Sequence, residues 1–270
     1  MTTPDLTPGT TPGDLVLLQR DARGVVTLTM NRPQSFNALS EDMLAALQQA
    51  LDAVAQDTSA RVMVLASAGK AFCPGHDLKE MSAQPELAYY QQLFKRCSQV
   101  MMGLQKLPIP VIARVQGIAT AAGCQLVAQC DLAVASSDAK FATSGINYGL
   151  FCATPSVPLV RNMGAKQAFE MLFTGDFISA GEALARGLVN RVVPADQLDA
   201  EVDRLAASIV QKPATAVAMG KALFYQQREL GMAAAYQLAA QTMAVNMMDE
   251  AAQEGFLAFT EKRAPRWRPG

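Results

Sequence analysis

The sequence contains a single histidine, His76, and a single tryptophan among its 270 residues. One histidine excludes metal sites built from several imidazole ligands, and we expect no bound metal. An excess of either charge is also lacking, because 23 basic residues face 24 acidic ones and the net charge is −1. The chain therefore has no general attraction for nucleic acid or for anionic membranes, and we expect neither as a partner.

Long apolar runs are absent, although half of the residues are hydrophobic. No uninterrupted apolar stretch approaches the roughly 18 residues that a membrane span needs. The N-terminal segment MTTPDLTPGTTPGDL has no basic region and no apolar run, so we expect neither a secretory signal nor a transit peptide. Its prolines, spaced among threonines, predict a disordered tail over residues 1–13.

Cysteine pairs with metal-ligand or redox spacing are also missing. The cysteines are odd in number and form no CxxC motif: Cys73, Cys97, Cys124, Cys130 and Cys152. This pattern predicts reduced, partly buried thiols rather than a disulfide framework. We therefore expect a cytoplasmic protein.

Strand-like and helix-like segments alternate along the first two thirds of the chain. Apolar patterning predicts a hairpin over 15–20 and 25–30, further strands at 61–67, 111–115, 131–136, 140–143 and 188–194, and a helix over 86–105. This order predicts an α/β fold with one central core over residues 14–194. Residues 195–270 are rich in alanine and methionine, and we expect a C-terminal helical subdomain there.

Two helix starts have clear sequence signals. Ser40 precedes an acidic first turn and apolar residues at helical spacing, as expected of an N-cap. Ser179 and Glu182 have the spacing of a capping box, and the glycine at position 187 is suited to end that helix.

Two glycine-containing segments combine small residues with a transition from strand to helix. They are FCPGHD (72–77) and AAGCQ (121–125). Small residues let a ligand approach the backbone closely, and the first N–H groups of a helix are unpaired and lie at the positive end of its dipole. Two such groups that converge would stabilise an oxyanion. From these residues alone, the signal is weak, and tight helix packing is the better explanation of the glycine and alanine.

Longer segments resemble the crotonase, or enoyl-CoA hydratase/isomerase, superfamily, and the resemblance covers nearly everything after residue 13. It is carried by NRPQSFNALS (31–40), AFCPGHDLKEM (71–81), VIARVQGIATAAGCQLVAQCDLAVAS (111–136), FTGDFISAGEALARGLVNRVVP (173–194) and EGFLAFTEKR (254–263). GLFCATP (149–155) and KRAPRW (262–267) resemble a subgroup of that superfamily that includes a mammalian protein. The resemblance implies a ClpP/crotonase-like β-β-α spiral core and a C-terminal trimerisation subdomain, in a homotrimer or homohexamer.

The same resemblance implies an acyl-CoA thioester as ligand, with coenzyme A arriving as part of the substrate rather than as a bound cofactor. The backbone N–H groups of His76 and Ala122 would form the oxyanion hole. The residues that would bind the substrate and its coenzyme A portion are Ser35, Phe36, Ala38, Ala71, Gly75, His76, Asp77, Leu78, Ala122, Gly145, Phe259 and Lys262. The last two would act in some relatives from a neighbouring subunit.

The acid and base groups of the family are missing. The two glutamates of enoyl-CoA hydratases correspond to Gln125 and Gly145, and the extra aspartate of dienoyl-CoA isomerases corresponds to Ala153. Glutamine can orient a water molecule but cannot accept its proton. A positioned acid or base contributes about 10²–10⁴-fold in rate, so standard hydration should be nearly lost.

Several functions therefore stay open. The resemblance favours an acyl-CoA enzyme of hydratase or isomerase type in fatty-acid metabolism, with Gln125 as the remaining polar group at a catalytic position. A non-catalytic acyl-CoA binder and a thioester hydrolase are the alternatives. The imidazole of His76 could be a general base, although the family uses only its backbone. Cys124 has no evident partner that would make it a nucleophile.

Overall fold

A computed structural model describes residues 14–267, and the predicted tail over residues 1–13 lies outside them. The strands are β1 Val16–Arg20, β2 Val25–Met30, β3 Val62–Ser67, β4 Val111–Val115, β5 Ala119–Thr120, β6 Leu132–Ser136, β7 Lys140–Ala142, β8 Ile178–Ser179 and β9 Arg191–Val193. The α-helices are α1 Glu41–Gln56, α2 Leu78–Ala83, α3 Leu87–Lys106, α4 Ala122–Gln129, α5 Ala153–Asn162, α6 Ala165–Thr174, α7 Ala180–Ala185, α8 Leu198–Val210, α9 Ala214–Gln227, α10 Met232–Met247 and α11 Glu250–Thr260. The predicted α/β class is confirmed.

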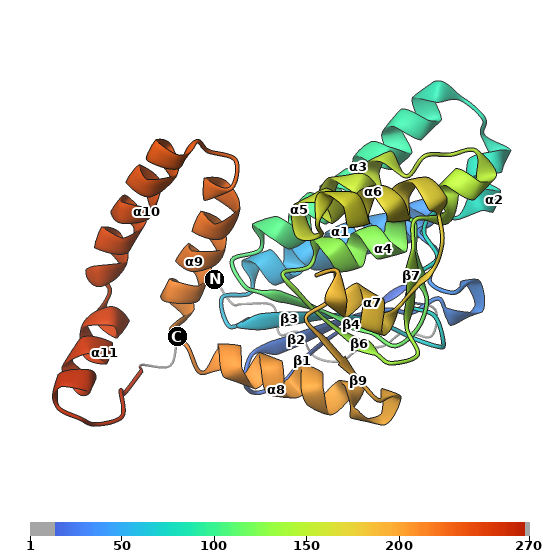
Figure 1. The fold of residues 1–270 in the computed structure, drawn as a ribbon. Helices are drawn as coiled ribbons and strands as arrows, with labels where there is room; N and C mark the ends of the chain where they lie inside the picture. Colours follow the sequence, from blue (N-terminus) through green and yellow to red (C-terminus); the bar gives the residue numbers. More distant parts are fainter. Residues whose placement is uncertain (1–13, 268–270) are drawn as a thin grey trace.

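The main sheet has six strands in the order β1-β2-β3-β4-β6-β9 (Figure 1). β1 pairs with β2 in antiparallel fashion, which confirms the predicted hairpin, and the remaining neighbours are parallel. A smaller sheet joins β5, β7 and β8. β5 leads directly into α4, so this small sheet positions the start of that helix.

Both faces of the main sheet are covered, which explains the continuous apolar run in β3. Met63 and Leu65 face the large core, which also contains residues of α1, α3 and α4. Val62 and Val64 face the opposite way, toward a smaller cluster with α8. Strands of parallel sheets that are buried on both faces lack the alternation of polar and apolar residues.

The predicted helix starts are confirmed. The Ser40 side chain accepts a hydrogen bond from the Met43 amide at 3.1 Å, and Ser179 with Glu182 forms a complete capping box. Three helices had no sequence prediction. They are α2, α5 and α6. α2 is short and buries no residue, so it has no apolar face that a pattern could reveal. α5 carries Pro158 in its interior, and proline argues against a helix in a sequence.

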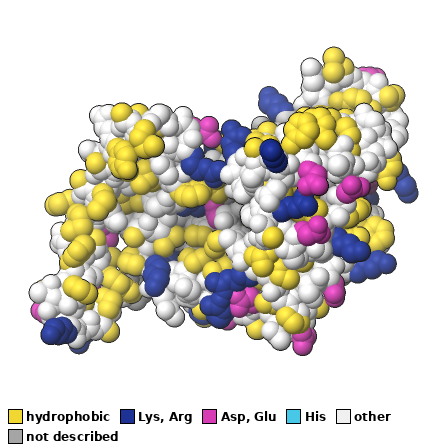
Figure 2. All heavy atoms as spheres, viewed as in Figure 1, with side chains coloured by type: hydrophobic (Ala, Val, Ile, Leu, Met, Phe, Trp, Pro, Cys, Tyr) yellow, Lys and Arg dark blue, Asp and Glu magenta, His cyan; other side chains and the backbone are white. Residues whose placement is uncertain are grey.

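The C-terminal helices divide into two groups. α8 packs on the main sheet, so the first part of the predicted C-terminal subdomain lies against the core. α9, α10 and α11 form an arm beside the core (Figure 1), and each of them has a single buried residue. Hydrophobic side chains spread over the visible face of this arm (Figure 2). No helix of residues 14–267 is long and apolar enough to cross a membrane.

Candidate active site

The two glycine-containing segments lie side by side at the start of α4. The Thr120 amide donates to the Cys73 carbonyl at 3.0 Å, and the Phe72 and Cys73 amides both donate to the Ile118 carbonyl. Gly123 packs directly on this loop, because an added Cβ would lie 2.0 Å from the Cys73 carbonyl oxygen. Only glycine permits so close an approach, and the glycine therefore sets the distance between the two segments.

The backbone at the start of α4 is in a strained conformation. Ala121 has φ 51° and ψ −121°, and its amide donates to the Ala142 carbonyl at 3.0 Å. A non-glycine residue at positive φ costs on the order of 1–3 kcal/mol, and such strain persists where the surrounding structure imposes it. Gly75 has φ +104°, and an added Cβ there would lie 3.2 Å from the Ala122 nitrogen. The residue after Gly75 is His76, so the two predicted donors lie close together.

The backbone N–H groups of His76 and Ala122 donate no hydrogen bond to any residue in the described part of the chain. The first N–H groups of a helix have no partner within that helix, so the Ala122 amide is free to bind a ligand, and the His76 amide lies close to it. Both residues line the same cavity, and Ala122 also lies at the positive end of the α4 dipole. Such a pair can stabilise negative charge that develops on a carbonyl oxygen.

The cavity has a volume of about 860 Å³ and is formed by six parts of the chain. Its walls come from residues 32–38, residues 74–81, Phe94 of α3, the start of α4 and residues 144–155, with residues 175–177 at one side. Apolar side chains such as Met81, Phe151 and Phe177 contribute to these walls. A largely apolar cavity with two backbone donors suits an acyl group that carries one polar carbonyl.

Most of the predicted binding residues line this cavity: Ser35, Phe36, Ala38, His76, Asp77, Leu78, Ala122 and Gly145. Ala71 and Gly75 do not line it. The Ala71 carbonyl accepts hydrogen bonds from Asn37 Nδ2 at 3.1 Å and Gln116 Nε2 at 3.2 Å, and thereby holds the loop in place. The binding roles themselves stay predictions.

Gln125, the predicted catalytic side chain, is 3% exposed and does not line the cavity. Its Oε1 atom is buried and has no hydrogen-bond partner. Phe259 and Lys262 also lie away from the cavity, since they belong to α11 and the turn after it. Phe259 is 83% exposed on that arm. One chain alone therefore does not bring Phe259 and Lys262 to the two donors, whereas Gln125 lies one turn after Ala122 in α4 but is buried behind the cavity wall.

Gly145 lies where no side chain fits. A Cβ built on it would be 2.6 Å from the Leu150 carbonyl oxygen and 2.9 Å from the Cys152 Sγ. The loop folds back because the Leu150 amide donates to the Gly145 carbonyl at 3.0 Å. Residues 145–152 therefore occupy the space into which a glutamate at position 145 would extend.

Few charged groups reach the cavity. Arg32 pairs with Asp77 at 3.2 Å, and Asp77 also caps α2 by accepting from the Lys79 amide at 3.1 Å. The exposed Asp176 lines one side and forms no ion pair with other described residues. Among neutral groups, Thr120 and Ser144 share a hydroxyl–hydroxyl hydrogen bond of 2.8 Å.

The imidazole of His76 lies against the ring of Phe94, with 5.5 Å between the centroids. Both ring nitrogens are buried and have no hydrogen-bond partner among residues 14–267. Burial lowers the pKa of His76 to about 4, and the Leu39 backbone only partly opposes this shift. The ring is therefore neutral at physiological pH, and its protonated form is strongly disfavoured in the folded protein.

This pKa predicts acid sensitivity. Below pH 6.5 the unfolded chain protonates His76, whereas the folded chain does so only near pH 4. The contribution of the neutral ring to stability is present above pH 6.5 and is lost between pH 6.5 and 4. Through this group, wild type should lose about 2 kcal/mol of unfolding free energy between pH 7 and pH 5. We expect His76→Asn to lose about 2 kcal/mol less than wild type over the same range, as measured by urea unfolding. Parallel pH curves for the two proteins would contradict this prediction.

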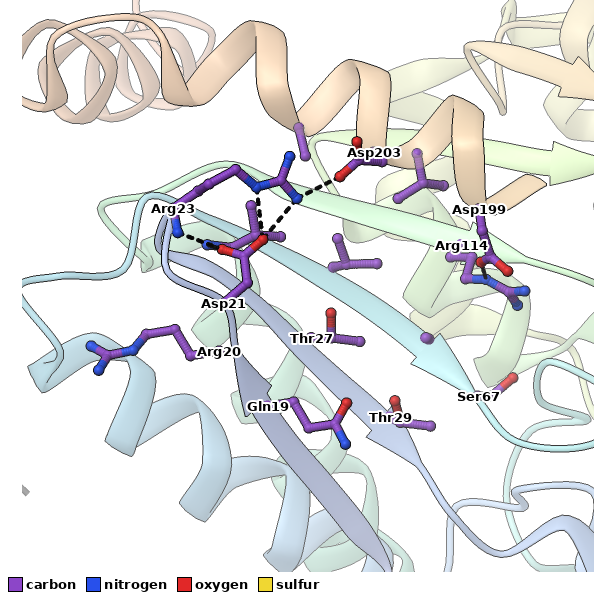
Figure 3. A pocket seen from close by; sticks show the side chains of 15 residues that line it. Gln19, Arg20, Asp21, Arg23, Thr27, Thr29, Ser67, Arg114, Asp199 and Asp203 are labelled. Carbon is purple, nitrogen blue, oxygen red and sulfur yellow. Dashed lines mark hydrogen bonds and ion pairs between the residues drawn. The ribbon is translucent and has the colours of Figure 1, made fainter. Parts of the chain in front are cut away.

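A second hollow, of about 690 Å³, lies between the main sheet and α8 (Figure 3). Gln19, Thr27 and Thr29 line it from the strands. Its arginines are all engaged in ion pairs: Arg20–Asp57, Arg23–Asp21, Arg23–Asp203 and Arg114–Asp199. The arginines of this hollow are thus already neutralised, which makes it a poor site for an anionic ligand.

The family profile described as Enoyl-CoA hydratase/isomerase matches residues 20–269. The chain belongs to this family. A crystal structure of an enoyl-CoA hydratase from Mycobacterium smegmatis is 63% identical, with a TM-score of 0.93, over 94% of this chain and 98% of that one. Human enoyl-CoA hydratase domain-containing protein 3 is 43% identical in its crystal structure, with a TM-score of 0.90, over 94% of this chain and 100% of that one. The predicted crotonase fold is confirmed.

The resemblance to a subgroup that includes a mammalian protein is also confirmed. Enoyl-CoA hydratase domain-containing protein 3 of Xenopus laevis is 45% identical over 94% of this chain and 86% of its own length. That relative and its human counterpart are named as mitochondrial proteins. These names contradict the expected cytoplasmic location. The expectation rested on cysteine chemistry, which separates reducing from oxidising compartments and cannot separate two reducing ones.

Many of the lining residues were not predicted from the sequence, and two of them contact Gly145. Cys152 and Leu150 belong to the segment GLFCATP, which was noticed only for its resemblance. Their contact with Gly145 depends on the loop that folds back, and no local pattern predicts this loop. The five cysteines are all buried and none is in a disulfide, as the sequence predicted.

Proposed function

We propose that this member of the enoyl-CoA hydratase/isomerase family binds an acyl-CoA thioester and stabilises its enolate, as an enzyme of fatty-acid or related thioester metabolism. The observation that carries the proposal is the pair of unpaired amides, of His76 and Ala122, at one largely apolar cavity. Coenzyme A would enter as part of the substrate. Family membership supports the acyl-CoA ligand.

Charge near Phe36 suits the phosphates of coenzyme A. Lys70 Nζ lies 5.5 Å from the centroid of the Phe36 ring, and Phe36 lines the cavity. Lys79 lines the same cavity from α2. A lysine binds phosphate as a flexible point charge, so these two ammonium groups can bind phosphates without a fixed geometry.

The thioester carbonyl tests the proposal directly. In bound butyryl-CoA labelled with ¹³C at C1, two N–H donors should weaken the C=O bond and shift its infrared band to lower frequency. Ala122→Pro removes one donor at the first residue of α4, where no helical hydrogen bond is lost. We expect this variant to lose most of the shift and, in any turnover assay, about 10²–10³-fold in rate. An unshifted band in the wild-type complex would contradict the proposal.

The missing carboxylates at Gln125 and Gly145 favour a second candidate, a non-catalytic acyl-CoA binder. It predicts tight binding without exchange of the protons on the α-carbon. A thioester hydrolase would instead release free coenzyme A thiol from butyryl-CoA. A colorimetric thiol assay and an exchange assay on one preparation distinguish these functions.

The exposed apolar residues of the arm support an oligomer, which we propose to be a homotrimer or homohexamer. Met232, Tyr236, Met243 and Met248 are each more than 70% exposed along α10 and its end. Partner arms would cover them, and Phe259 and Lys262 of a second copy would reach the cavity. We expect Tyr236→Glu/Met243→Glu to lower the mass measured by light scattering to that of a monomer. A monomeric wild-type protein would contradict the oligomer.

A further inference from the structure

The cavity needs a group that moves a proton to or from the substrate, and the sequence offers none at the expected positions. Gln125 is a neutral amide that does not line the cavity. Asp77 is already engaged with Arg32 and with the start of α2. The ring nitrogens of His76 are buried without a partner, and Asp176 is exposed at one side.

Cys152 differs from these groups in its position. Its Sγ is 2.9 Å from the Cβ that a side chain at position 145 would have, so the sulfur lies beside the point from which the family glutamate would extend. Cys152 lines the cavity together with Ala122 and Gly145, whereas the other four cysteines do not. It is only 6% exposed, so the cavity is its main access to other molecules.

The surroundings of the thiol are suited to proton transfer. Burial raises the pKa of Cys152, and the Gly145 backbone amide opposes that rise by stabilising the thiolate. The hydroxyl pair of Thr120 and Ser144 lines the same cavity beside Gly145. A mostly protonated thiol with a donor for its anion can both give and take a proton.

We propose that the Cys152 thiol exchanges a proton with the α-carbon of the bound acyl group and takes the place of the missing glutamate at position 145. This inference rests on the proposed function, because it needs the enolate held by the His76 and Ala122 amides. When the thiolate takes the proton, the Cα–H bond breaks and an S–H bond forms. The electron pair moves to the carbonyl oxygen. The reverse step returns a proton from the thiol to Cα, and the net chemistry neither oxidises nor reduces any group.

The test is uptake of deuterium at the α-carbon of butyryl-CoA in D₂O, followed by mass spectrometry, with binding measured by calorimetry on the same samples. We expect wild type to exchange, and Cys152→Ser to lose about 10²-fold or more while it still binds. Cys97→Ser, a buried cysteine outside the cavity, is the matched control and should stay within about twofold. A variant that still binds has kept its fold.

The pH dependence separates a thiol from a carboxylate. If Cys152 is the base, the wild-type rate minus the Cys152→Ser rate rises steadily from pH 7 to 9, because burial raises the pKa of the thiol and the thiolate fraction increases over this range. Cys152→Asp should exchange with a rate that is flat over this range. Exchange that survives in Cys152→Ser, is lost in Asp176→Asn, or is absent from a wild type that binds would overturn the inference. Absence of binding would instead refute the proposed function, and this inference with it.

Discussion

Lys221→Ala is expected to lower the free energy of unfolding by about 3–5 kcal/mol. The Lys221 side chain is 6% exposed and pairs with Asp131 Oδ2 at 2.7 Å. Its ammonium also donates to the carbonyls of Leu104 and Ile109, each at 2.9 Å. Alanine would leave a poorly solvated carboxylate and two carbonyls without their donor. Since Lys221 is the one buried residue of α9, the cluster also anchors the arm to the core.

A matched variant separates the ion pair from its neighbouring hydrogen bond. Tyr225 donates to Asp131 Oδ1 at 2.6 Å, and Tyr225→Phe removes this bond but leaves the ion pair intact. We expect it to cost about 1–2 kcal/mol in urea unfolding. Lys221→Met/Asp131→Asn should be more stable than Lys221→Ala because no charge is left unpaired. A loss below about 1 kcal/mol in Lys221→Ala would contradict the anchoring role.

Gly123→Ala is expected to abolish acyl-CoA binding and to destabilise the fold by about 3 kcal/mol. The new methyl group would lie 2.0 Å from the Cys73 oxygen and 2.7 Å from its carbonyl carbon. Both atoms belong to backbone that cannot rotate away. The loop would have to move, and the loop carries the His76 amide. Calorimetric titration with butyryl-CoA measures the binding, and urea unfolding measures the stability.

Gly220→Ala is the control for the same chemical change. Gly220 lies in α9, and an added Cβ there meets nothing within 4 Å. Alanine should stabilise this helix by about 0.5–1 kcal/mol and leave binding unchanged. If Gly123→Ala bound butyryl-CoA as tightly as Gly220→Ala, the two loops would not need their close contact.

The hairpin, the buried strands and the helix caps could be predicted from the sequence because their signals are local. β3 is a continuous apolar run, and Ser40 is followed by an acidic turn. α5 could not be predicted, since Pro158 in its interior is tolerated only in this packed context. The anchor of the arm was equally hidden, because Lys221 and Asp131 are 90 residues apart.

The candidate site also has some features that the sequence predicts and others that depend on the three-dimensional fold. The segments that carry His76 and Ala122 could be identified because they resemble a known family, whereas their glycines and small residues alone are better explained by tight packing. The sequence also indicates that glutamate is missing at Gly145. It cannot indicate that any side chain there would meet Leu150 and Cys152, because that contact depends on how the loop folds back. A Gly145→Glu replacement is therefore a poor way to restore hydratase chemistry, and a carboxylate introduced at Cys152 is the better design.

The most direct test of the oxyanion site is a crystal structure of the complex with butyryl-CoA. If the account is right, the thioester oxygen lies within about 2.7–3.1 Å of the backbone nitrogens of both His76 and Ala122. The acyl chain then occupies the cavity lined by Phe151 and Phe177. A thioester oxygen turned away from both nitrogens, or a ligand in the hollow between the sheet and α8, would contradict it.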